Sequence, residues 1–347
     1  MNPLDVAVVG GGQAGLAMAW HLRRRGLNCT VLDAGEPGGS WAARWDSLRL
    51  FTPARYDGLP GMPFPGDPDR HPTKDEVAAY LRSYAATFDL PVRSGHRVTE
   101  LRRDAAGFAL DGAGETILAR QVVVATGPFQ TPWVPALAEG LSPRVAQLHS
   151  AEYRRPDDLR DGPVLVVGGG NSGRQIALEL ARTRRVDLAV GSRAAVVPQT
   201  VLGRDLFWWL TRSGLVTASG DSVLGRRMRA RGELVVGTSD ARLREAGVTL
   251  RGRVTGAAGT AVTVDDTVLE VDTVVWATGY RRDDSWITIP GALEHRRRGE
   301  TAVPGLYVLG LPWLHSRGSA LLGFVGADAA HLAERIAARD ARTGVPR

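Results

Sequence analysis

The chain opens with a short run of apolar residues that ends in glycines and passes into a helical pattern. Residues 6–9 are all apolar, residues 10–15 read G-x-G-x-x-G, and apolar side chains recur at helical spacing over 16–25. A short apolar run bounded by a glycine turn predicts a buried strand, and the recurring spacing predicts a helix. A second strand is expected over 28–32. The pattern therefore predicts a strand–turn–helix–strand unit.

The same pattern recurs near the middle of the chain. Residues 164–167 are apolar, 168–173 repeat the glycine fingerprint, and a helix is expected over 174–182. One such fingerprint is weak evidence, but two in the full strand–glycine–helix context strongly favour two dinucleotide-binding units. Strands at 122–124 and 274–276 each end in Ala-Thr-Gly and are expected to close one unit. The predicted fold is therefore α/β, with two Rossmann-like domains.

In the first unit each glycine has a distinct task. Gly10 makes a tight turn, Gly12 lets the backbone approach a pyrophosphate, and Gly15 allows close helix–strand packing. The phosphates would bind the unpaired N–H groups at the helix N-terminus. Asp33 ends the second strand, where a carboxylate accepts the hydrogen bonds of an adenosine ribose. This unit is therefore predicted to bind an unphosphorylated ribose.

The second unit differs where the ribose would lie. After the strand over 186–190 it reads Gly191-Ser192-Arg193 and carries no acidic residue. A carboxylate would repel a ribose 2′-phosphate, whereas a guanidinium and a hydroxyl would bind it. The second unit is therefore predicted to bind NADPH.

Composition excludes several other classes of protein. The single cysteine, Cys29, excludes disulfide reductases that use a cysteine pair, and the seven scattered histidines predict no metal site. The net charge of +6 comes almost entirely from dispersed arginines, because Lys74 is the only lysine, so no nucleic-acid groove is predicted. No apolar stretch is long enough for a membrane span and no signal peptide is recognised, so a cytoplasmic location is expected.

Taken together, these residues resemble the flavin-containing, NADPH-dependent monooxygenases with two dinucleotide-binding domains, the class B flavoprotein monooxygenases. The resemblance covers essentially the full length, including Gly38-Gly39-Ser40-Trp41 and the segment 304–310. It implies a discontinuous FAD-binding domain, residues 1–152 and 286–347, into which an NADPH-binding domain, residues 153–285, is inserted. The polar stretches 152–163 and 281–305 are interpreted as crossings between the domains.

The glycine units and the resemblance together define the candidate site residues. Those expected at FAD are Gly10, Gly12, Gln13, Ala14, Gly15, Asp33, Ser40, Trp41, Thr52, Ala125, Thr126, Gly127 and Gly310. Those expected at NADPH are Gly168, Gly170, Asn171, Ser172, Gly173, Ser192, Arg193, Ala277, Thr278 and Gly279. The candidate catalytic residues are His149, Arg317 and Thr52. Arg317 is a candidate to stabilise negative charge at the flavin, and His149 to hold the interdomain linker or contact the nicotinamide.

The resemblance implies a reaction as well. FAD reduced by NADPH would react with O₂ to give a C4a-peroxide, which inserts one oxygen atom into a small molecule, a soft heteroatom nucleophile or a ketone. Water must be excluded from such a site, and the aromatic cluster at 207–210 is a candidate wall, with interdomain core as the alternative interpretation. The oligomeric state, monomer or homodimer, is left open.

Two departures from the family pattern keep other functions open. The Thr52 loop lacks the asparagine that many relatives carry, and Pro143 and Val145 replace the Phe and Gly of a signature of which His149 and Tyr153 remain. The alternative function is an NADPH:acceptor reductase that passes electrons to a quinone, ferredoxin or flavodoxin without oxygenation. A dinucleotide-binding regulator ranks last, because no partner-binding segment is recognised.

Overall fold

The apolar run near the N-terminus forms the centre of a parallel sheet in the computed structural model, which describes residues 3–192, 194–294 and 296–343. Strand β1 (Leu4–Val9) lies between β2 (Cys29–Leu32) and β6 (Glu115–Val124) and is parallel to both. Outer parallel strands are β3 (Val92–Arg93) and β23 (Leu306–Val308). The full order is β21-β22-β23-β6-β1-β2-β3, and β5 attaches β4 to β6.

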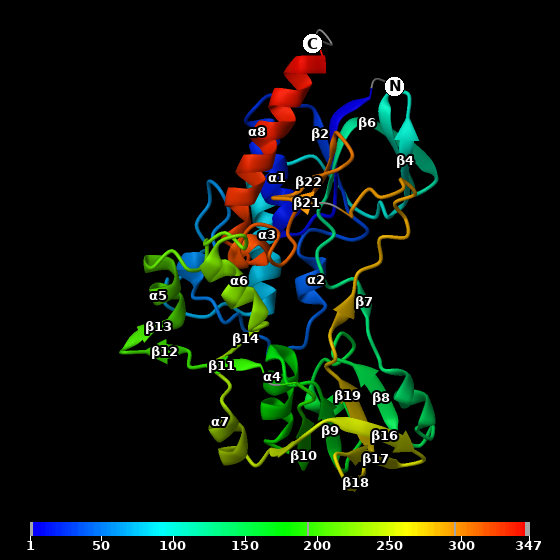
Figure 1. The fold of residues 1–347 in the computed structure, drawn as a ribbon, viewed down its shortest axis with the longest axis vertical. Coiled ribbons are helices and arrows are strands. Elements are labelled where there is room, and N and C mark those ends of the chain that lie inside the picture. The colour runs from blue at the N-terminus through cyan, green and yellow to red at the C-terminus, as the bar shows by residue number, and fades with distance from the viewer. Residues whose placement is uncertain (1–2, 193, 295, 344–347) are drawn as a thin grey trace.

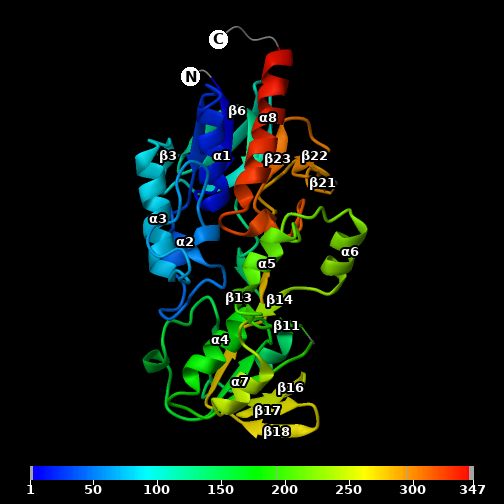
Figure 2. The same ribbon diagram turned by 90° about the vertical axis from the view of Figure 1, so that its left-hand side faces the viewer.

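Helices cover one face of this first sheet. The helices α1, α3 and α8 pack over it through apolar residues such as Leu16, Leu81 and Leu332, which are fully buried (Figure 2). The β4–β5 pair and residues 286–293 contribute to the core on the other face. The remaining elements of this half are α1 (Gln13–Arg23), α2 (Gly39–Ala42), η1 (Ala54–Tyr56), α3 (Lys74–Thr87), β4 (Val98–Asp104), β5 (Gly107–Gly112), β21 (Arg296–Arg297), β22 (Glu300–Thr301), η4 (Arg317–Ala320) and α8 (Val325–Thr343).

The second glycine unit builds a second, smaller sheet of five parallel strands. Its order is β15-β10-β9-β19-β8, with β9 at its centre. The elements of this half are η2 (Ala136–Gly140), β8 (Ala146–His149), η3 (Pro156–Asp158), β9 (Val164–Val167), α4 (Asn171–Leu180), β10 (Val186–Ala189), α7 (Asp240–Glu245), β15 (Thr249–Arg251), β16 (Val254–Ala258), β17 (Ala261–Val264), β18 (Thr267–Glu270) and β19 (Thr273–Trp276). The predicted α/β fold with two Rossmann-like sheets is confirmed.

The two sheets lie in two lobes joined by a narrow waist (Figure 1). Both chain crossings run through this waist, where β7 (Thr131–Pro132) pairs antiparallel with β20 (Tyr280–Arg281). Because all strands of the second sheet lie between β6 and β21 in the sequence, the first half is discontinuous, as predicted. The chain already enters the second sheet at β8, before the stretch 152–163; the predicted domain boundaries at 153 and 285 stay a prediction.

An arm leaves the second half and packs against the first. It runs between β11 (Ala195–Val197) and β14 (Leu234–Val236) and contains β12 (Thr200–Val201), β13 (Arg204–Asp205), α5 (Leu206–Arg212) and α6 (Val223–Ala230). Phe207 and Leu210 are buried in a cluster that includes Phe51 and Phe324 of the first half. The rings of Phe51 and Phe207 stack with centroids 5.7 Å apart. The arm therefore covers the loops at the lower end of the first sheet. Among the described residues, no helix has the length and apolar character that crossing a membrane requires.

Candidate cofactor and active site

The first glycine turn is built to hold a phosphate group. Gly10 has φ +110°, and a Cβ on it would lie 2.5 Å from the carbonyl oxygen of Ala125. A Cβ on Gly15 would lie 1.8 Å from the carbonyl oxygen of Gly10, so the helix must approach the strand without a side chain. Gly12 instead faces open space, with nothing within 4 Å of its Cβ position. Helix α1 starts directly after it without a side-chain cap, which leaves N–H groups free for an anion.

The second glycine turn repeats this geometry. Gly168 has φ +125°, and its Cβ would lie 2.2 Å from the carbonyl oxygen of Ala277. A Cβ on Gly173 would lie 1.9 Å from the carbonyl oxygen of Gly168, whereas Gly170 again faces open space. Helix α4 also begins without a side-chain cap. The chain therefore carries two matching cradles, each fitted to the diphosphate of a dinucleotide.

The residue that ends the second strand distinguishes the two cradles. Asp33 follows β2, and its carboxylate accepts the N–H groups of Gly11 and, at 2.7 Å, Gly35. Gly11 lies directly against the Asp33 side chain, and the corresponding Gly169 lies against Val190. An apolar side chain thus replaces the carboxylate, so the second cradle cannot bind ribose hydroxyls in the way the first can.

A hydroxyl group and a basic group lie near Val190 in the second unit. Ser192 is exposed, and Arg253 donates to the carbonyl oxygen of Gly191 at 2.6 Å. Arg253 was not among the predicted site residues. It follows β15 in the sequence, and only the pairing of β15 with β10 brings it next to Gly191. Arg193, the predicted ligand of a 2′-phosphate, lies outside the described residues, so its role stays a prediction.

Several predicted FAD residues meet around the first cradle. Gln13 accepts a hydrogen bond from the Trp41 indole N–H at 3.2 Å and donates to the carbonyl oxygen of Ala320 at 3.5 Å. Ala14 is buried, and a Cβ added to Gly310 would lie 2.7 Å from the Cβ of Ala14. Ser40 is exposed. The contacts of Gln13 therefore join the first turn of α1, helix α2 and the loop that carries Arg317.

Each Ala-Thr-Gly turn is tied to the opposite chain crossing. The Gln130 amide donates to the Thr126 hydroxyl at 2.8 Å and to the Gly127 carbonyl, and it accepts the Asp283 N–H at 2.8 Å. In the second turn the Thr278 hydroxyl donates to the carbonyl oxygen of Trp133, whose N–H donates to the Gly279 carbonyl at 3.0 Å. The two turns thereby anchor both ends of the waist.

His149 lies at the waist and both of its ring nitrogens are engaged. Its Nε2 is 2.9 Å from the carbonyl oxygen of Gly279, and its Nδ1 accepts the Ala151 N–H at 3.1 Å. Because a carbonyl oxygen only accepts, Nε2 carries the proton and the ring is neutral. Burial lowers the pKa of His149, which favours the same neutral form. Its catalytic assignment stays a prediction, and these contacts favour a positioning role.

A guanidinium links the two halves next to His149. Arg44, which follows α2, donates to the Tyr280 hydroxyl and lies 5.3 Å from the centre of that ring. The same guanidinium is 5.6 Å from the ring of Phe129, and His149 meets Tyr280 edge-on. Sequence reasoning missed Arg44, because no spacing signal connects residues so far apart in the chain.

Arg317 lies in the loop that faces the arm. It is partly buried, and within the described part of the chain no carboxylate or carbonyl pairs with its guanidinium. Burial lowers its pKa, and the charge of Glu233 in the arm opposes that shift. The loop is held by the arm itself, since the Gly318 N–H donates to the Val216 carbonyl at 2.9 Å. Arg317 is therefore a positive charge next to the arm that has no hydrogen-bonded acceptor among the described residues, and its catalytic role stays a prediction.

Thr52 is paired with a buried carboxyl group that sequence reasoning overlooked. Its hydroxyl donates to Asp57 at 2.6 Å. Asp57 is 1% exposed, and its second oxygen has no hydrogen-bond partner among the described residues. Burial raises the pKa of Asp57 to about 7, and the Thr52 hydrogen bond only partly offsets this. The loop next to it, with Tyr56, Gly323 and Phe324, borders a cavity of about 470 Å³.

A buried arginine supports the second glycine turn. Arg174, the residue after the glycine turn, is 3% exposed. It donates to the Gly169 carbonyl at 2.9 Å and to the Asp240 carboxylate at 2.7 Å. The Asn171 amide is also engaged, because it bonds the Leu234 carbonyl at 2.8 Å and the Val236 N–H at 3.0 Å. The Asn171 side chain therefore fastens β14, where the arm ends, to the glycine turn.

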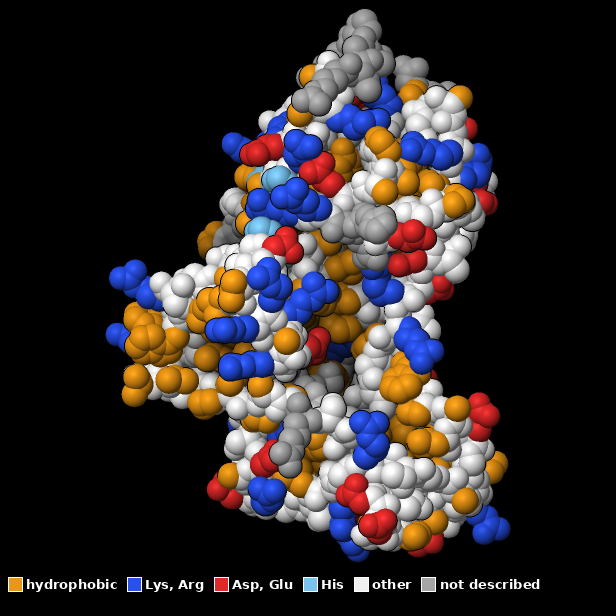
Figure 3. Space-filling view, viewed as in Figure 1, with side chains coloured by type: hydrophobic (Ala, Val, Ile, Leu, Met, Phe, Trp, Pro, Cys, Tyr) orange, Lys and Arg blue, Asp and Glu red, His pale blue; other side chains and the backbone are white. Residues whose placement is uncertain are grey.

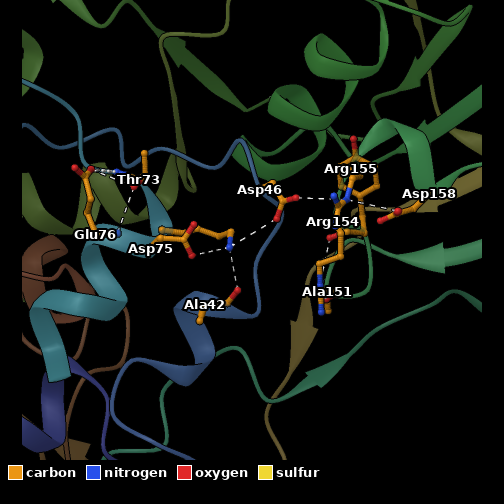
Figure 4. Close-up of polar contacts among 11 residues, drawn as sticks. Ala42, Asp46, Thr73, Asp75, Glu76, Ala151, Arg154, Arg155 and Asp158 are labelled. Carbon is orange, nitrogen blue, oxygen red and sulfur yellow. Dashed lines mark hydrogen bonds and ion pairs between the residues drawn. The ribbon is translucent and has the colours of Figure 1, made fainter.

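The single lysine lies in a brace between the halves (Figure 4). Lys74, at the start of α3, is buried and donates to the Ala42 carbonyl at 3.1 Å and to Asp75 at 2.8 Å. Its ammonium is 3.8 Å from Asp46, whose carboxylate is 3.5 Å from Arg155 beyond β8. Charged side chains thus connect α3 to the first residues of the second half.

Two cradles of this kind in one chain are typical of oxidoreductases that bind two dinucleotides. The model of the pyridine nucleotide-disulphide oxidoreductases matches residues 7–199, and the chain belongs to this family. Membership confirms the prediction of an oxidoreductase that uses FAD and a pyridine nucleotide. Because Cys29 is the only cysteine and is buried, this member lacks the cysteine pair that disulfide reduction needs.

Individual proteins resemble the chain over nearly its whole length. An uncharacterized CzcO-like oxidoreductase of Geobacillus kaustophilus is 42% identical over 96% of this chain and 98% of that protein. The indole-3-pyruvate monooxygenase YUCCA1 of Oryza sativa is 32% identical over 95% and 90%. The solved flavin-containing monooxygenase of Stenotrophomonas maltophilia superimposes with a TM-score of 0.82 at 30% identity, covering 98% of this chain and 100% of that one. The predicted flavin monooxygenase resemblance is confirmed.

Proposed function

We propose that the protein uses FAD and NADPH to insert one oxygen atom from O₂ into a small molecule, a soft heteroatom nucleophile or a ketone. The observation that carries this proposal is the pair of open, uncapped cradles at Gly12 and Gly170 in one chain. Similarity over nearly the full length to two proteins named as monooxygenases, one of them flavin-containing, supports oxygenation over other uses of the same cofactors.

The residues divide the cofactors between the cradles. The Asp33 carboxylate can accept hydrogen bonds from the unphosphorylated ribose of FAD. Val190 occupies the equivalent position in the second cradle, so no carboxylate there would repel a ribose 2′-phosphate. Ser192 and Arg253, with Arg193, supply hydroxyl and guanidinium groups for a 2′-phosphate. We therefore assign FAD to the first half and NADPH to the second, with the β7–β20 pair as the crossing between them.

The chain's own residues orient and shield the reaction. When bound, the flavin supplies hydride acceptance and O₂ activation. Gln13 holds Trp41 and the Ala320 carbonyl in place beside it, and Arg317 places a positive charge where negative charge develops. Phe207 and Leu210 of the arm exclude water from the cleft. His149 and Arg44 fix the angle between the halves.

The decisive experiment separates oxygenation from electron transfer. The purified yellow protein is reduced anaerobically with NADPH and then mixed with O₂, with and without sulfides, amines and ketones. Oxygenation predicts bleaching by NADPH, a transient absorbance near the blue edge of the visible region, and an oxygenated product. If all O₂ is recovered as H₂O₂ while a quinone, ferredoxin or flavodoxin accepts electrons rapidly, the protein is instead a reductase.

Replacing Arg193 with glutamate is expected to reverse the choice of pyridine nucleotide. The change substitutes a carboxylate for the guanidinium proposed to bind the 2′-phosphate, so kcat/KM for NADPH falls about 100-fold while that for NADH holds or rises. Steady-state reduction of the flavin with each coenzyme measures this ratio. Arg182→Glu, an exposed arginine on the same half, serves as the charge-matched control. An unchanged ratio in the Arg193 variant contradicts the NADPH assignment.

A further inference from the structure

The outer side of the arm, residues 199–233, concentrates exposed apolar side chains. Seven large hydrophobic side chains are exposed in the described part of the chain, and four of them lie in this segment: Leu202, Trp209, Val223 and Leu224. Leu202 is 86% exposed, the largest value of the seven. A single exposed apolar residue needs no explanation, but a cluster marks an interaction surface.

Leu202 is held at the tip of the β12–β13 hairpin in an unfavourable backbone conformation. Its φ is +48° and that of the next residue, Gly203, is +71°. Such two-residue turns favour Asn or Gly, because other side chains are strained at positive φ. Folding of the hairpin therefore does not call for a leucine at this place. A strained apolar residue that also faces solvent points to a contact outside the chain.

The indole groups near the tip have the same character. Trp209 is 37% exposed, and its N–H is satisfied by the Val201 carbonyl at 2.9 Å, so the ring presents an apolar surface. Arg204 stacks over the neighbouring Trp208 at 5.5 Å from the ring centre. Tryptophan beside arginine is the pairing found where proteins enter the headgroup layer of a bilayer.

Basic residues alternate with these apolar side chains along the same segment. All six arginines of the arm are exposed, and none forms an ion pair with the described residues: Arg204, Arg212, Arg226, Arg227, Arg229 and Arg231. Of the three acidic residues, Asp205 is engaged in capping α5 and bonding Gln199. Figure 3 shows the projecting arm coloured mostly by hydrophobic and basic side chains, with little acidic surface.

We propose that the arm docks the protein on an anionic membrane surface. The four exposed apolar side chains would enter the headgroup layer while the arginines bind lipid phosphates, because apolar burial and charge attraction add at such an interface. A second copy of the chain is disfavoured as the occupant, because a two-fold contact would set these unpaired arginines against one another. Docking needs no contribution from the cofactors, so it stands apart from the proposed oxygenation.

The inner side of the same arm explains what docking would achieve. Gly220 donates its N–H to the His315 carbonyl at 2.7 Å, and Phe207 stacks on Phe51. The membrane-facing side and the side that covers the Arg317 loop therefore belong to one short segment. Docking would hold the Arg317 loop close to the bilayer, where apolar substrates concentrate.

Vesicle sedimentation with the FAD-loaded full chain tests the proposal. The protein is mixed with vesicles of phosphatidylcholine alone, or with about 30% phosphatidylglycerol, at low and high salt. We expect binding only to the anionic vesicles and release at high salt. The variant Leu202→Ser/Val223→Ser/Leu224→Ser, and separately Arg226→Gln/Arg227→Gln/Arg229→Gln, should each lower the partition coefficient about 10-fold or more.

Matched controls carry the same kinds of change elsewhere. They are Val268→Ser, which is 63% exposed on β18, and Arg182→Gln/Arg185→Gln/Arg244→Gln on the second half. Both should bind vesicles like the parent, and circular dichroism with the retained flavin checks that every variant folds. Failure of the parent to bind anionic vesicles, or equal binding by the arm variants, overturns the proposal. So does a dimer that only the Leu202/Val223/Leu224 variant dissociates, because a second copy would then be the occupant.

Discussion

Replacing Gly170 with alanine is expected to weaken NADPH binding about 10- to 100-fold without disturbing the fold or the bound FAD. A Cβ at this position meets no protein atom within 4 Å, so the folded chain accepts it. The same methyl group would occupy the space through which the backbone approaches a pyrophosphate, and a steric conflict of that size costs about 1–3 kcal/mol. Anaerobic flavin reduction over a range of NADPH concentrations gives the dissociation constant.

The first cradle provides the matched variant. Gly12 also faces open space, so Gly12→Ala should lose FAD on gel filtration while its apoprotein unfolds at the same temperature as the FAD-free parent. Gly173→Ala is the contrasting change, because its Cβ would lie 1.9 Å from a carbonyl oxygen and should destabilise the second half itself. If Gly170→Ala binds NADPH like the parent, the second cradle does not hold the diphosphate.

Replacing Asp57 with asparagine is expected to stabilise the protein at pH 8 by about 2–4 kcal/mol and to leave it nearly unchanged at pH 4. Burial raises the pKa of Asp57 from 3.8 to about 7, so between these values the folded state binds more protons than the unfolded state. Stability therefore falls as pH rises through this window, and the full shift corresponds to about 4 kcal/mol. Asparagine does not ionise, so the variant does not lose this stability as the pH rises.

Urea unfolding of parent and Asp57→Asn across pH 4–8.5 measures the difference. Thr52→Val is the companion variant, because the Thr52 hydrogen bond lowers the pKa of Asp57 and its removal should move the midpoint of the pH profile upward. Parallel pH profiles for parent and Asp57→Asn would mean that the carboxyl group titrates normally in the folded protein.

The sequence predicted the parts of the site that local geometry dictates. The spacing of the glycine fingerprint alone predicts four glycines that cannot be replaced, because a side chain on any of them would collide with a neighbouring backbone: Gly10, Gly15, Gly168 and Gly173. The helix starts were nevertheless placed late, at residues 16 and 174, whereas α1 and α4 begin at Gln13 and Asn171. The last residues of each glycine turn already form the first turn of the helix. The apolar pattern does not show this, because it does not extend over the glycines.

Contacts between distant segments left no signal in the sequence. Arg44 meets Tyr280 only because segments 236 residues apart in the chain lie together at the waist. The contact between Thr52 and Asp57 forms within one irregular loop, and no periodicity records it either. Strand β8 was missed because it is short and only its last residue, His149, is buried. In the aromatic cluster at 207–210, Phe207 and Leu210 pack against the first half, which favours the interpretation as interdomain core, whereas Trp209 is 37% exposed and belongs to neither the core nor a wall.

Lys74 gives the protein a single side-chain amine, and that amine is 8% exposed within the brace. Reagents that acylate lysine therefore find one side-chain target, which they reach only when α3 and the Asp46 loop separate. The extent of acylation at Lys74 would thus report how often α3 and the Asp46 loop separate, and arginines do not react with the reagent.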